Sequence, residues 1–412
     1  MRDDIHEIGY ADMSQILRSL ICYEPNGAMN VEQPQVLIDQ VRRDTPVVRW
    51  EMGIGFFSMA DVVAAARHPA MRSTEPNSGE AMGMGSVDPL IPLHIDGDLH
   101  KHYRKLLDPL FAPRRMALLE TSIRGLVDEL IDGFIAEGHA DLHSAICVPL
   151  PTTVFLNLFG LPLEDAVFLN EKKNRILKNE GTNMGEMEVI GRAAGAEMDD
   201  HLRMRLAQRR AELERHDDLL DSFLHFEVDG HSLTDHDIVN LMHMFTIAGL
   251  DTVTSSLSCL FAWFAKHPEQ RRDIVAHPER LGGAIEELMR YESPVPSGGV
   301  RFVVEDGEVN GVPIRKGDMA YLCWASANLD PASCSNPLDV DLVRENNTHI
   351  AFAAGLHRCL GSHLARAEMR AAIDQFHSRI SDYWITEGDD AEYEFAGVRQ
   401  AKRVPVSFVA KA

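Results

Sequence analysis

The sequence predicts a mainly α-helical fold with a small β portion, and three observations carry that prediction. Hydrophobic residues make up 45% of the 412-residue chain and charged residues 25%, which is typical of a globular protein with a large core. Helical apolar periodicity dominates from about residue 99 onward. No linker composition interrupts the chain, so residues 1–412 are expected to form a single domain, with residues 1–40 as a less regular N-terminal extension.

The N-terminal third combines a hairpin, a helix and a long loop. Residues 47–59 predict a β-hairpin that turns near Gly53, and residues 60–67 predict a helix. Residues 74–92 are rich in Gly, Pro, Met and Ser, which indicates an irregular loop. Loops of this length usually have a function or lack order.

A long helix is predicted over residues 235–266. Thr234 and Asp237 resemble a capping box, in which the cap hydroxyl and the acid three residues later satisfy each other's backbone N–H groups. The apolar run that follows ends before His267-Pro268.

The C-terminal third is predicted to alternate helices and strands. A helix carries residues 284–291 and stops before Pro294, and another covers residues 360–378. Residues 300–325 predict strands with hairpin turns at Asn310-Gly311 and Lys316-Gly317, and short strands are expected at the C-terminus.

Charge and cysteine content exclude several classes of function. The chain has 40 basic and 63 acidic residues, a net charge of −23, which argues against binding to nucleic acid or to an anionic membrane surface. Neither a secretory signal at residues 1–7 nor a membrane anchor in the polar-interrupted stretch 248–265 is expected. The six cysteines lie far apart, at positions 22, 147, 259, 323, 334 and 359, which favours a cytoplasmic location and five small buried side chains.

One cysteine stands in a distinctive local sequence. In the segment Phe352–Gly361, Cys359 lies at the N-terminal end of the helix predicted from residue 360. Free backbone N–H groups and the helix dipole favour a thiolate at that place. From these residues alone Cys359 is a nucleophile, a metal ligand or a buried cysteine near a glycine cap.

The same segment resembles the heme-ligand loop of the cytochrome P-450 family, Phe-x-x-Gly-x-x-x-Cys-x-Gly, through Phe352, Gly355, Cys359 and Gly361. The resemblance implies the fold of these heme-thiolate monooxygenases, with the long helix over the heme. It implies heme b as cofactor and Cys359 as the axial iron ligand. Three further motifs follow the family's order along the chain.

The second motif is Ala248-Gly249-Leu250-Asp251-Thr252 in the middle of the long helix. A glycine there costs about 1 kcal/mol relative to alanine, and a buried carboxylate costs more, so either the run has a function or it forms a solvated face. The resemblance implies that Ala248 and Gly249 lie against the heme. It also implies that Thr252 hydrogen-bonds the oxygen held on the oxygen-binding face, while Asp251 relays protons from water.

The third motif is Glu287-Leu288-Met289-Arg290, whose acid and base share a helix face. Such pairs are common and weak on a surface, and the resemblance implies a structural role for Glu287 and Arg290 in supporting the heme-side core. Asp339 stands where many relatives have an arginine that completes this network, so the network is expected to be rebuilt.

The fourth motif places His100 and Arg104 four residues apart on one helix face. They resemble the His-x-x-x-Arg pair that binds heme propionates, a task that suits the planar fork of arginine. Arg301 matches a family arginine and His357 lies two residues before Cys359, and both are expected to be further propionate partners. The alternative for each is an exposed basic side chain.

The implied reaction inserts one oxygen atom from O₂ into a lipophilic small molecule that resembles a terpenoid, a steroid or a fatty acid. The chain shows neither a Gly-x-Gly-x-x-Gly fingerprint nor a cysteine cluster, so electrons are expected from NAD(P)H through a separate ferredoxin reductase and ferredoxin. The protein is expected to be monomeric. The basic side chains expected to contact an acidic ferredoxin are Arg104, Lys105, Arg114, Arg115 and Arg358.

By resemblance, the substrate pocket is lined by Met82, Met84, Val87, Met244, Phe245, Ala248, Val295, Pro296, Val300 and Phe395. Core packing is the alternative for each of them, and Gly298-Gly299 indicates free room beside the heme. Three other functions stay open: a peroxide-driven hydroxylase, a heme-binding sensor or carrier without turnover, and a cysteine-nucleophile hydrolase.

Overall fold

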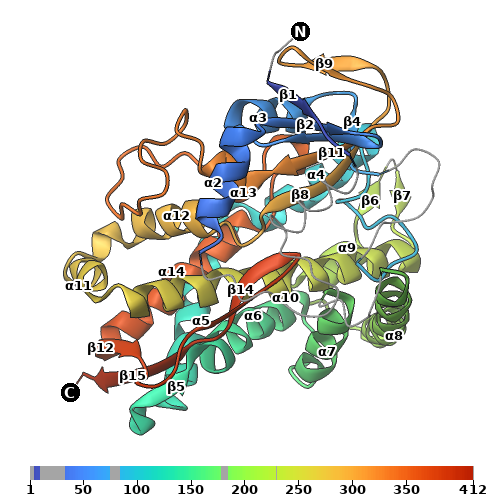
Figure 1. Cartoon of the computed structure of the whole chain (residues 1–412). Helices are drawn as coiled ribbons and strands as arrows, with labels where there is room; N and C mark the ends of the chain where they lie inside the picture. The colour runs from blue at the N-terminus through green and yellow to red at the C-terminus, as the bar shows by residue number, and fades with distance from the viewer. Residues whose placement is uncertain (1–3, 10–32, 75–83, 178–183, 229, 412) are drawn as a thin grey trace.

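The computed structural model describes residues 4–9, 33–74, 84–177, 184–228 and 230–411. Figure 1 shows a mixed sheet at the end of the molecule nearest the N-terminus and a helical body crossed by one long helix, α10. The mainly α-helical fold with a small β portion is therefore confirmed. The helices are α2 (Gln35–Asp44), α3 (Met59–Arg67), α4 (Gly97–Leu107), α5 (Pro113–Asp132), α6 (Pro149–Phe159), α7 (Asp165–Leu177), α8 (Met184–Ala211), α9 (Leu219–Leu224), α10 (Asp235–Lys266), α11 (Pro268–Ala276), α12 (Leu281–Glu292), α13 (Trp324–Asn328) and α14 (Ser362–Arg379).

The long helix α10 has the predicted bounds. Its cap is the predicted capping box, because the Asp237 N–H donates to the Thr234 hydroxyl (3.2 Å) and the Thr234 N–H donates to the Asp237 carboxylate (2.9 Å). One stretch of α10 packs with α5 and α14 in a first core, and another packs with α6, α8 and α9 in a second core. Because α10 runs between these two cores, it is buried on nearly all sides.

The main sheet joins strands from distant parts of the chain in the order β1-β2-β3-β11-β8-β4. The predicted hairpin is confirmed, because β2 and β3 pair antiparallel around Glu51-Met52. The strands are β1 (Ile5–Glu7), β2 (Val47–Trp50), β3 (Gly53–Phe56), β4 (Met71–Arg72), β5 (His139–Asp141), β6 (Glu227–Val228), β7 (His231–Ser232), β8 (Ser297–Val303), β9 (Gly307–Val309), β10 (Val312–Ile314), β11 (Met319–Cys323), β12 (Ile380–Ile385), β13 (Glu392–Ala396), β14 (Val398–Arg403) and β15 (Pro405–Ala410).

One of the two predicted hairpin turns is confirmed and the other is wrong. Asn310 and Gly311 both have positive φ, as a tight turn requires, and they connect the antiparallel strands β9 and β10. Lys316-Gly317 does not close a hairpin, because β11 pairs with β8 and β3, while β10 pairs with β9. The Gly317 N–H bonds to the Val303 carbonyl, so this turn is attached to β8.

The helices predicted over residues 60–67, 284–291 and 360–378 correspond to α3, α12 and α14. Part of the expected N-terminal extension is regular, because β1 pairs parallel with β2 and residues 35–40 begin α2. The rest of it, residues 1–3 and 10–32, lies outside the described residues. By length and composition α10 could cross a membrane, yet most of it is buried inside the protein.

Candidate active site

The loop before α14 places Cys359 at the start of that helix. A single 3-10 turn, Gly355–His357, precedes the cysteine, and the Cys359 N–H donates to the Phe352 carbonyl (2.9 Å). Gly355 has a φ of 75°, and a Cβ there would collide with the carbonyl of Ala66. The motif glycine is therefore needed both for its backbone conformation and for the close contact with α3.

Cys359 differs from the other cysteines that the structure describes. Its side chain is exposed, whereas Cys147, Cys259, Cys323 and Cys334 are buried, as expected for packing residues; Cys22 lies outside the described part of the chain. Although the residue as a whole is exposed, protein atoms packed around the thiol desolvate it, and this desolvation raises the pKa of the thiol. The Gly361 N–H and the nearby arginines oppose the rise without reversing it. These surroundings do not activate Cys359 as a free nucleophile.

Basic side chains from three elements gather near this loop. The rings of His100 on α4 and His357 lie 4.4 Å apart, and His357 Nε2 is 3.0 Å from the Asp96 carboxylate. Arg104 donates to the carbonyl of Arg358 (2.9 Å), one turn of α4 after His100. The structure therefore brings together the two motifs that carry His100, Arg104 and His357, although 254 residues separate Arg104 from Arg358.

Two members of this basic group are buried without an acidic partner. Among the described residues, neither ring nitrogen of His100 has a hydrogen-bond partner, and burial lowers the pKa of His100 to about 4. Arg301 on β8 is 7% exposed and donates to the carbonyls of Gly298 and Val300, with no salt bridge within the described part of the chain. Burial also lowers the pKa of Arg301. Two buried bases in this condition fit an anionic ligand.

Asp96 is a candidate site residue that the sequence did not point to. Although burial raises its pKa, hydrogen bonds from His357 and Ser73 hold it at about 2. The carboxylate therefore stays ionised and orients His357 through Nε2. The only sequence signal was its place just before the helix that carries His100 and Arg104.

The acid and the alcohol predicted on α10 are both held by specific bonds. Asp251 is 3% exposed, and Lys173 Nζ on α7 donates to its Oδ1 at 2.8 Å, so the solvated-face alternative for this acid is wrong. The Thr252 hydroxyl donates to the carbonyl of Ala248 (2.7 Å). A Cβ on Gly249 would meet only the Phe155 ring, at an ordinary 3.5 Å. No pattern in the sequence pointed to Lys173.

The Glu287–Arg290 pair is fully buried and is completed by Arg344. Arg290 donates two hydrogen bonds of 2.8 Å to the Glu287 carboxylate, and Arg344 Nε adds a third of 3.0 Å. Asp339 contributes its backbone carbonyl, which accepts from both arginines. The missing family arginine is thus replaced by one five residues later in the sequence, where no motif pointed to it.

The predicted pocket residues divide into several groups. Met244 is buried, whereas Met84, Val295 and Val300 are half-buried and Val87 is exposed. Met82 and the side chain of Phe395 lie outside the described residues. Pro296 is buried.

Two of the expectations about the pocket change with the structure. The Phe245 ring stacks on Phe111 (5.4 Å) and packs near Phe159 and Phe223, so it belongs to the second core. The free room inferred from Gly298-Gly299 is wrong at Gly298, because a Cβ there would collide with the ring of Trp324, whereas a Cβ on Gly299 would meet only open space. Gly298 is therefore explained by the close approach of this tryptophan to β8.

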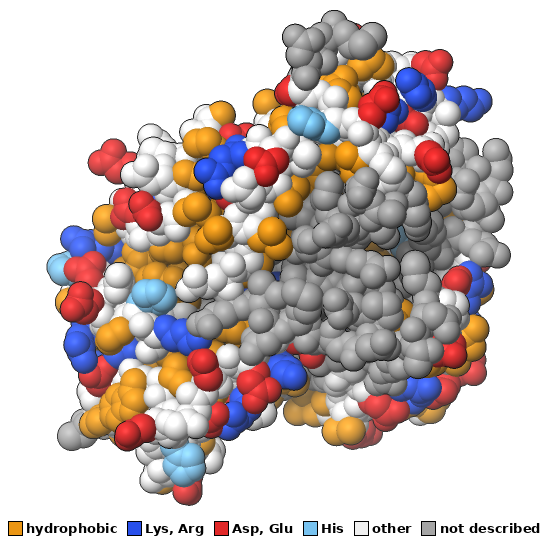
Figure 2. All heavy atoms as spheres, viewed as in Figure 1, with side chains coloured by type: hydrophobic (Ala, Val, Ile, Leu, Met, Phe, Trp, Pro, Cys, Tyr) orange, Lys and Arg blue, Asp and Glu red, His pale blue; other side chains and the backbone are white. Residues whose placement is uncertain are grey.

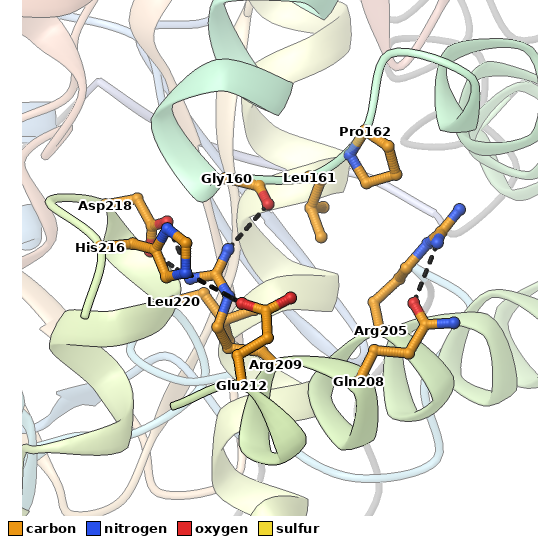
Figure 3. Close-up of a pocket in the computed structure, with 10 residues that line it drawn as sticks. All are labelled: Gly160, Leu161, Pro162, Arg205, Gln208, Arg209, Glu212, His216, Asp218 and Leu220. Atoms are coloured by element: carbon orange, nitrogen blue, oxygen red, sulfur yellow. Dashed lines mark hydrogen bonds and ion pairs between the residues drawn. The ribbon is translucent and has the colours of Figure 1, made fainter. Parts of the chain in front are cut away.

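A groove of about 410 Å³ between the end of α6, the end of α8 and the start of α9 is separate from these residues. Figure 3 shows its charged side chains bonded to one another: Arg209 to Asp218 and the Gly160 carbonyl, and His216 to Glu212. These polar groups already satisfy each other. On the molecular face in Figure 2, acidic, basic and apolar side chains are interspersed, as expected for a solvated surface.

The site and the fold together define a known class of protein. The family model described as Cytochrome P-450 matches residues 182–277 and 279–379. The chain is 32% identical to the probable cytochrome P-450 127A1 of Sinorhizobium fredii, over 75% of this chain and 72% of that protein. It is 33% identical to the pentalenic acid synthase of Streptomyces avermitilis, over 70% of each chain. The chain therefore belongs to the cytochrome P-450 family and is a monooxygenase in that general sense.

Solved structures agree with this assignment. The polyketide cytochrome P-450 PksS of Bacillus subtilis superposes with a TM-score of 0.81 at 26% identity, covering 93% of this chain and 99% of that one. The P-450 BioI chain from a complex with a fatty-acid-loaded acyl carrier protein gives 0.83 at 25% identity, covering 91% and 98%. Heme as the cofactor follows from the family.

Proposed function

We propose that this protein is a heme-thiolate monooxygenase that inserts one atom of O₂ into a lipophilic small molecule, with Cys359 as the iron ligand. The observation that carries the proposal is the arrangement around Cys359. It is the exposed cysteine of the described chain, and its neighbour Arg358 bonds to Arg104 on α4, the helix that also carries the buried His100, whose ring nitrogens have no partner.

The residues present fit heme. Cys359 supplies a thiol that a metal ion deprotonates on binding. His100, Arg104, Arg301 and His357 supply donors for the two propionates, and His100 and Arg301 gain partners that the protein itself does not provide. Gly361 has open space where a Cβ would lie. When bound, heme supplies the oxygen-activating chemistry, which uses electrons from outside the chain.

On α10, two side chains supply and position protons. The Thr252 hydroxyl is held by the Ala248 carbonyl, which fixes where its oxygen stands as an acceptor. The Asp251 carboxylate is held by Lys173, and release of this bond frees it to take a proton from water and pass it toward Thr252. Lys173 is therefore a positioning residue for Asp251.

The substrate is a terpenoid-, steroid- or fatty-acid-like molecule. Methionine and valine side chains among the pocket residues (Met84, Met244, Val295 and Val300) provide an adaptable apolar lining. Two curated relatives, pentalenic acid synthase and the methyl-branched lipid omega-hydroxylase of Mycobacterium tuberculosis, carry names that refer to such molecules; the second is 28% identical over 89% of each chain.

Electrons come from NAD(P)H through a ferredoxin reductase and an acidic ferredoxin, in the cytoplasm, to a monomeric enzyme. Lys105, Arg114 and Arg358 are exposed and form the docking group. Arg104 and Arg115 are already paired with Asp108 and Asp217. Charge reversal at the three exposed positions is expected to slow reduction by ferredoxin, whereas Arg210→Glu on α8 leaves the rate unchanged; equal rates in all variants would contradict this docking group.

The deciding experiment is the absorption spectrum of the reduced, carbon-monoxide-bound protein. A Soret band typical of thiolate ligation is expected, lost in Cys359→Ala and kept in the control Cys334→Ala. A histidine-type band would refute the ligand, and a colourless, heme-free protein would favour the hydrolase. Product formed with peroxide but not with the reductase system would indicate a peroxide-driven enzyme. Substrate-induced spectral change without any product would indicate a sensor or carrier.

A further inference from the structure

The segment 84–92 is fastened to α10 by two side chains one turn apart. Asn240 Oδ1 accepts from the Ile91 N–H (2.7 Å), and its Nδ2 donates to the Pro89 carbonyl (3.1 Å). At the other end of the segment, His243 Nε2 lies 2.8 Å from the Met84 carbonyl. Three backbone groups of an otherwise irregular segment are thus held by one face of a helix.

The same segment is pressed against α7 and α8. A Cβ on Gly195 of α8 would collide with the carbonyl of Gly85, and a Cβ on Gly85 would come within 2.8 Å of Ile176 on α7. Met84 and Gly85 both have positive φ, 60° and 75°. A methionine rarely adopts this conformation unless its surroundings impose it, so the bonds and contacts of the segment determine its course.

The hydrogen bonds of His243 require an additional proton. Its Nδ1 lies 2.7 Å from Oδ1 of Asp199 on α8, and its Nε2 faces the Met84 carbonyl. A carboxylate and a carbonyl only accept hydrogen bonds, so both ring nitrogens donate when both bonds are made. A neutral ring has one N–H and can keep only one of the two bonds. With 1% exposure, His243 has no water to replace the other.

We infer that doubly protonated His243, together with Asn240, is a positioning device that holds segment 84–92 as one wall of the substrate cavity and sets how fast a ligand enters. When the His243 ring loses one proton, it keeps the bond to Asp199 and loses the bond to the Met84 carbonyl. The role of this wall rests on the proposed function, whereas the attachment of the segment does not.

The other charged groups near His243 have partners of their own. On α7 and α8, Lys172 pairs with Glu197, Lys173 with Asp251, His201 with Asp165 and Arg203 with Asp200. On segment 84–92, Asp88 lies 3.4 Å from His236 of α10. On α9, Asp221 faces Arg215 and His225, and α6 contributes no titratable side chain. Among the described residues, Asp199 is thus the acid that contacts the His243 ring.

Hydrogen–deuterium exchange of the amides in segment 84–92 tests the attachment. In the full-length holoenzyme, exchange corrected for its intrinsic pH dependence is expected to be about tenfold faster at about pH 9 than at about pH 6, because a ring that lacks one proton cannot donate to both Asp199 and the Met84 carbonyl. His243→Phe exchanges rapidly at both pH values. Asp199→Asn exchanges slowly at both, because its amide can donate to Nδ1 and a neutral ring then still donates to Met84. His236→Gln removes the other histidine contact to the segment, that with Asp88, and is expected to keep the pH response, which assigns the response to His243.

The second readout is the association rate of 4-phenylimidazole, followed by the shift of the Soret band. It is expected to rise about tenfold in His243→Phe and to stay at the wild-type value in Asp199→Asn at about pH 6. If amide exchange in the wild type does not depend on pH, the attachment through His243 is wrong. If exchange depends on pH but the association rate of 4-phenylimidazole does not change in His243→Phe, the segment has no role in ligand entry. If His243→Phe fails to fold, the pH dependence of exchange in the wild type, compared with that in Asp199→Asn, tests the attachment. The exchange measurement is also possible on a protein without heme.

Discussion

Lys173 and Asp251 form an ion pair of 2.8 Å in which both side chains are almost fully buried, with 5% and 4% of their surfaces exposed. The pair joins α7 to the centre of α10 across 78 positions of the chain. A carboxylate at this place in an apolar helix is tolerated because a single buried ammonium group compensates its charge.

Removal of one partner of that pair is expected to be costly. Lys173→Met leaves the Asp251 carboxylate buried and unpaired, and should lower the free energy of unfolding by about 3 kcal/mol in urea denaturation. The double variant Lys173→Met with Asp251→Leu is expected to recover most of the loss, while losing turnover. A single variant as stable as the wild type would show that the pair contributes nothing.

The network around Glu287 predicts a large loss of stability from a substitution at one position and almost none from a substitution at a nearby one. Burial tends to raise the pKa of Glu287, but bonds from Arg290, the Asp341 N–H and Arg344 hold it below its usual value. Arg344→Ala removes one of these bonds and should cost about 3 kcal/mol. Asp339→Ala should change stability by less than about 0.5 kcal/mol, because Asp339 contributes only its backbone carbonyl. Thermal and urea unfolding of both variants test this contrast, and equal losses would contradict it.

His100 is expected to affect the heme-free and heme-bound proteins in opposite directions. Its two ring nitrogens are buried without partners, so His100→Leu should stabilise the heme-free protein by about 1 kcal/mol. The same change removes a proposed propionate donor and should speed heme transfer to apomyoglobin. The two measurements are urea unfolding without heme and the transfer rate with it. A variant that loses stability without heme would contradict the assignment.

Glu368 on α14 predicts a pH dependence of stability. Burial raises the pKa of this carboxyl from 4.5 to about 8, so the folded protein binds a proton that the unfolded chain has released between these values. The free energy of unfolding should therefore fall as the pH rises through this interval, by at most about 1.4 kcal/mol per pH unit from this group. Glu368→Gln lacks that contribution. The difference between wild type and variant, followed by urea unfolding from about pH 5 to about pH 8, isolates it; a constant difference would contradict the raised pKa.

Features encoded by nearby residues could be predicted from the sequence. The capping box of Thr234 and Asp237, the Asn310-Gly311 turn and the loop that precedes Cys359 each depend on a few adjacent side chains and backbone angles. The long helix and the family resemblance followed from such local patterns. His100 and Arg104 could be placed on one helix face for the same reason, although the pairing of His100 with His357 needed the fold.

The remaining features depend on groups that only the tertiary structure brings together. Lys173, Arg344 and Asp96 have ordinary sequence surroundings, and their partners lie 78, 57 and 261 positions away. The pairing of β11 with β3 and β8, and not with β10, likewise depends on which strands the fold places beside it in the sheet. The sequence by itself determined the family, the helices and the iron ligand expected within it. The fold decided which buried charges are compensated, because compensation depends on distance in space and not on separation along the chain.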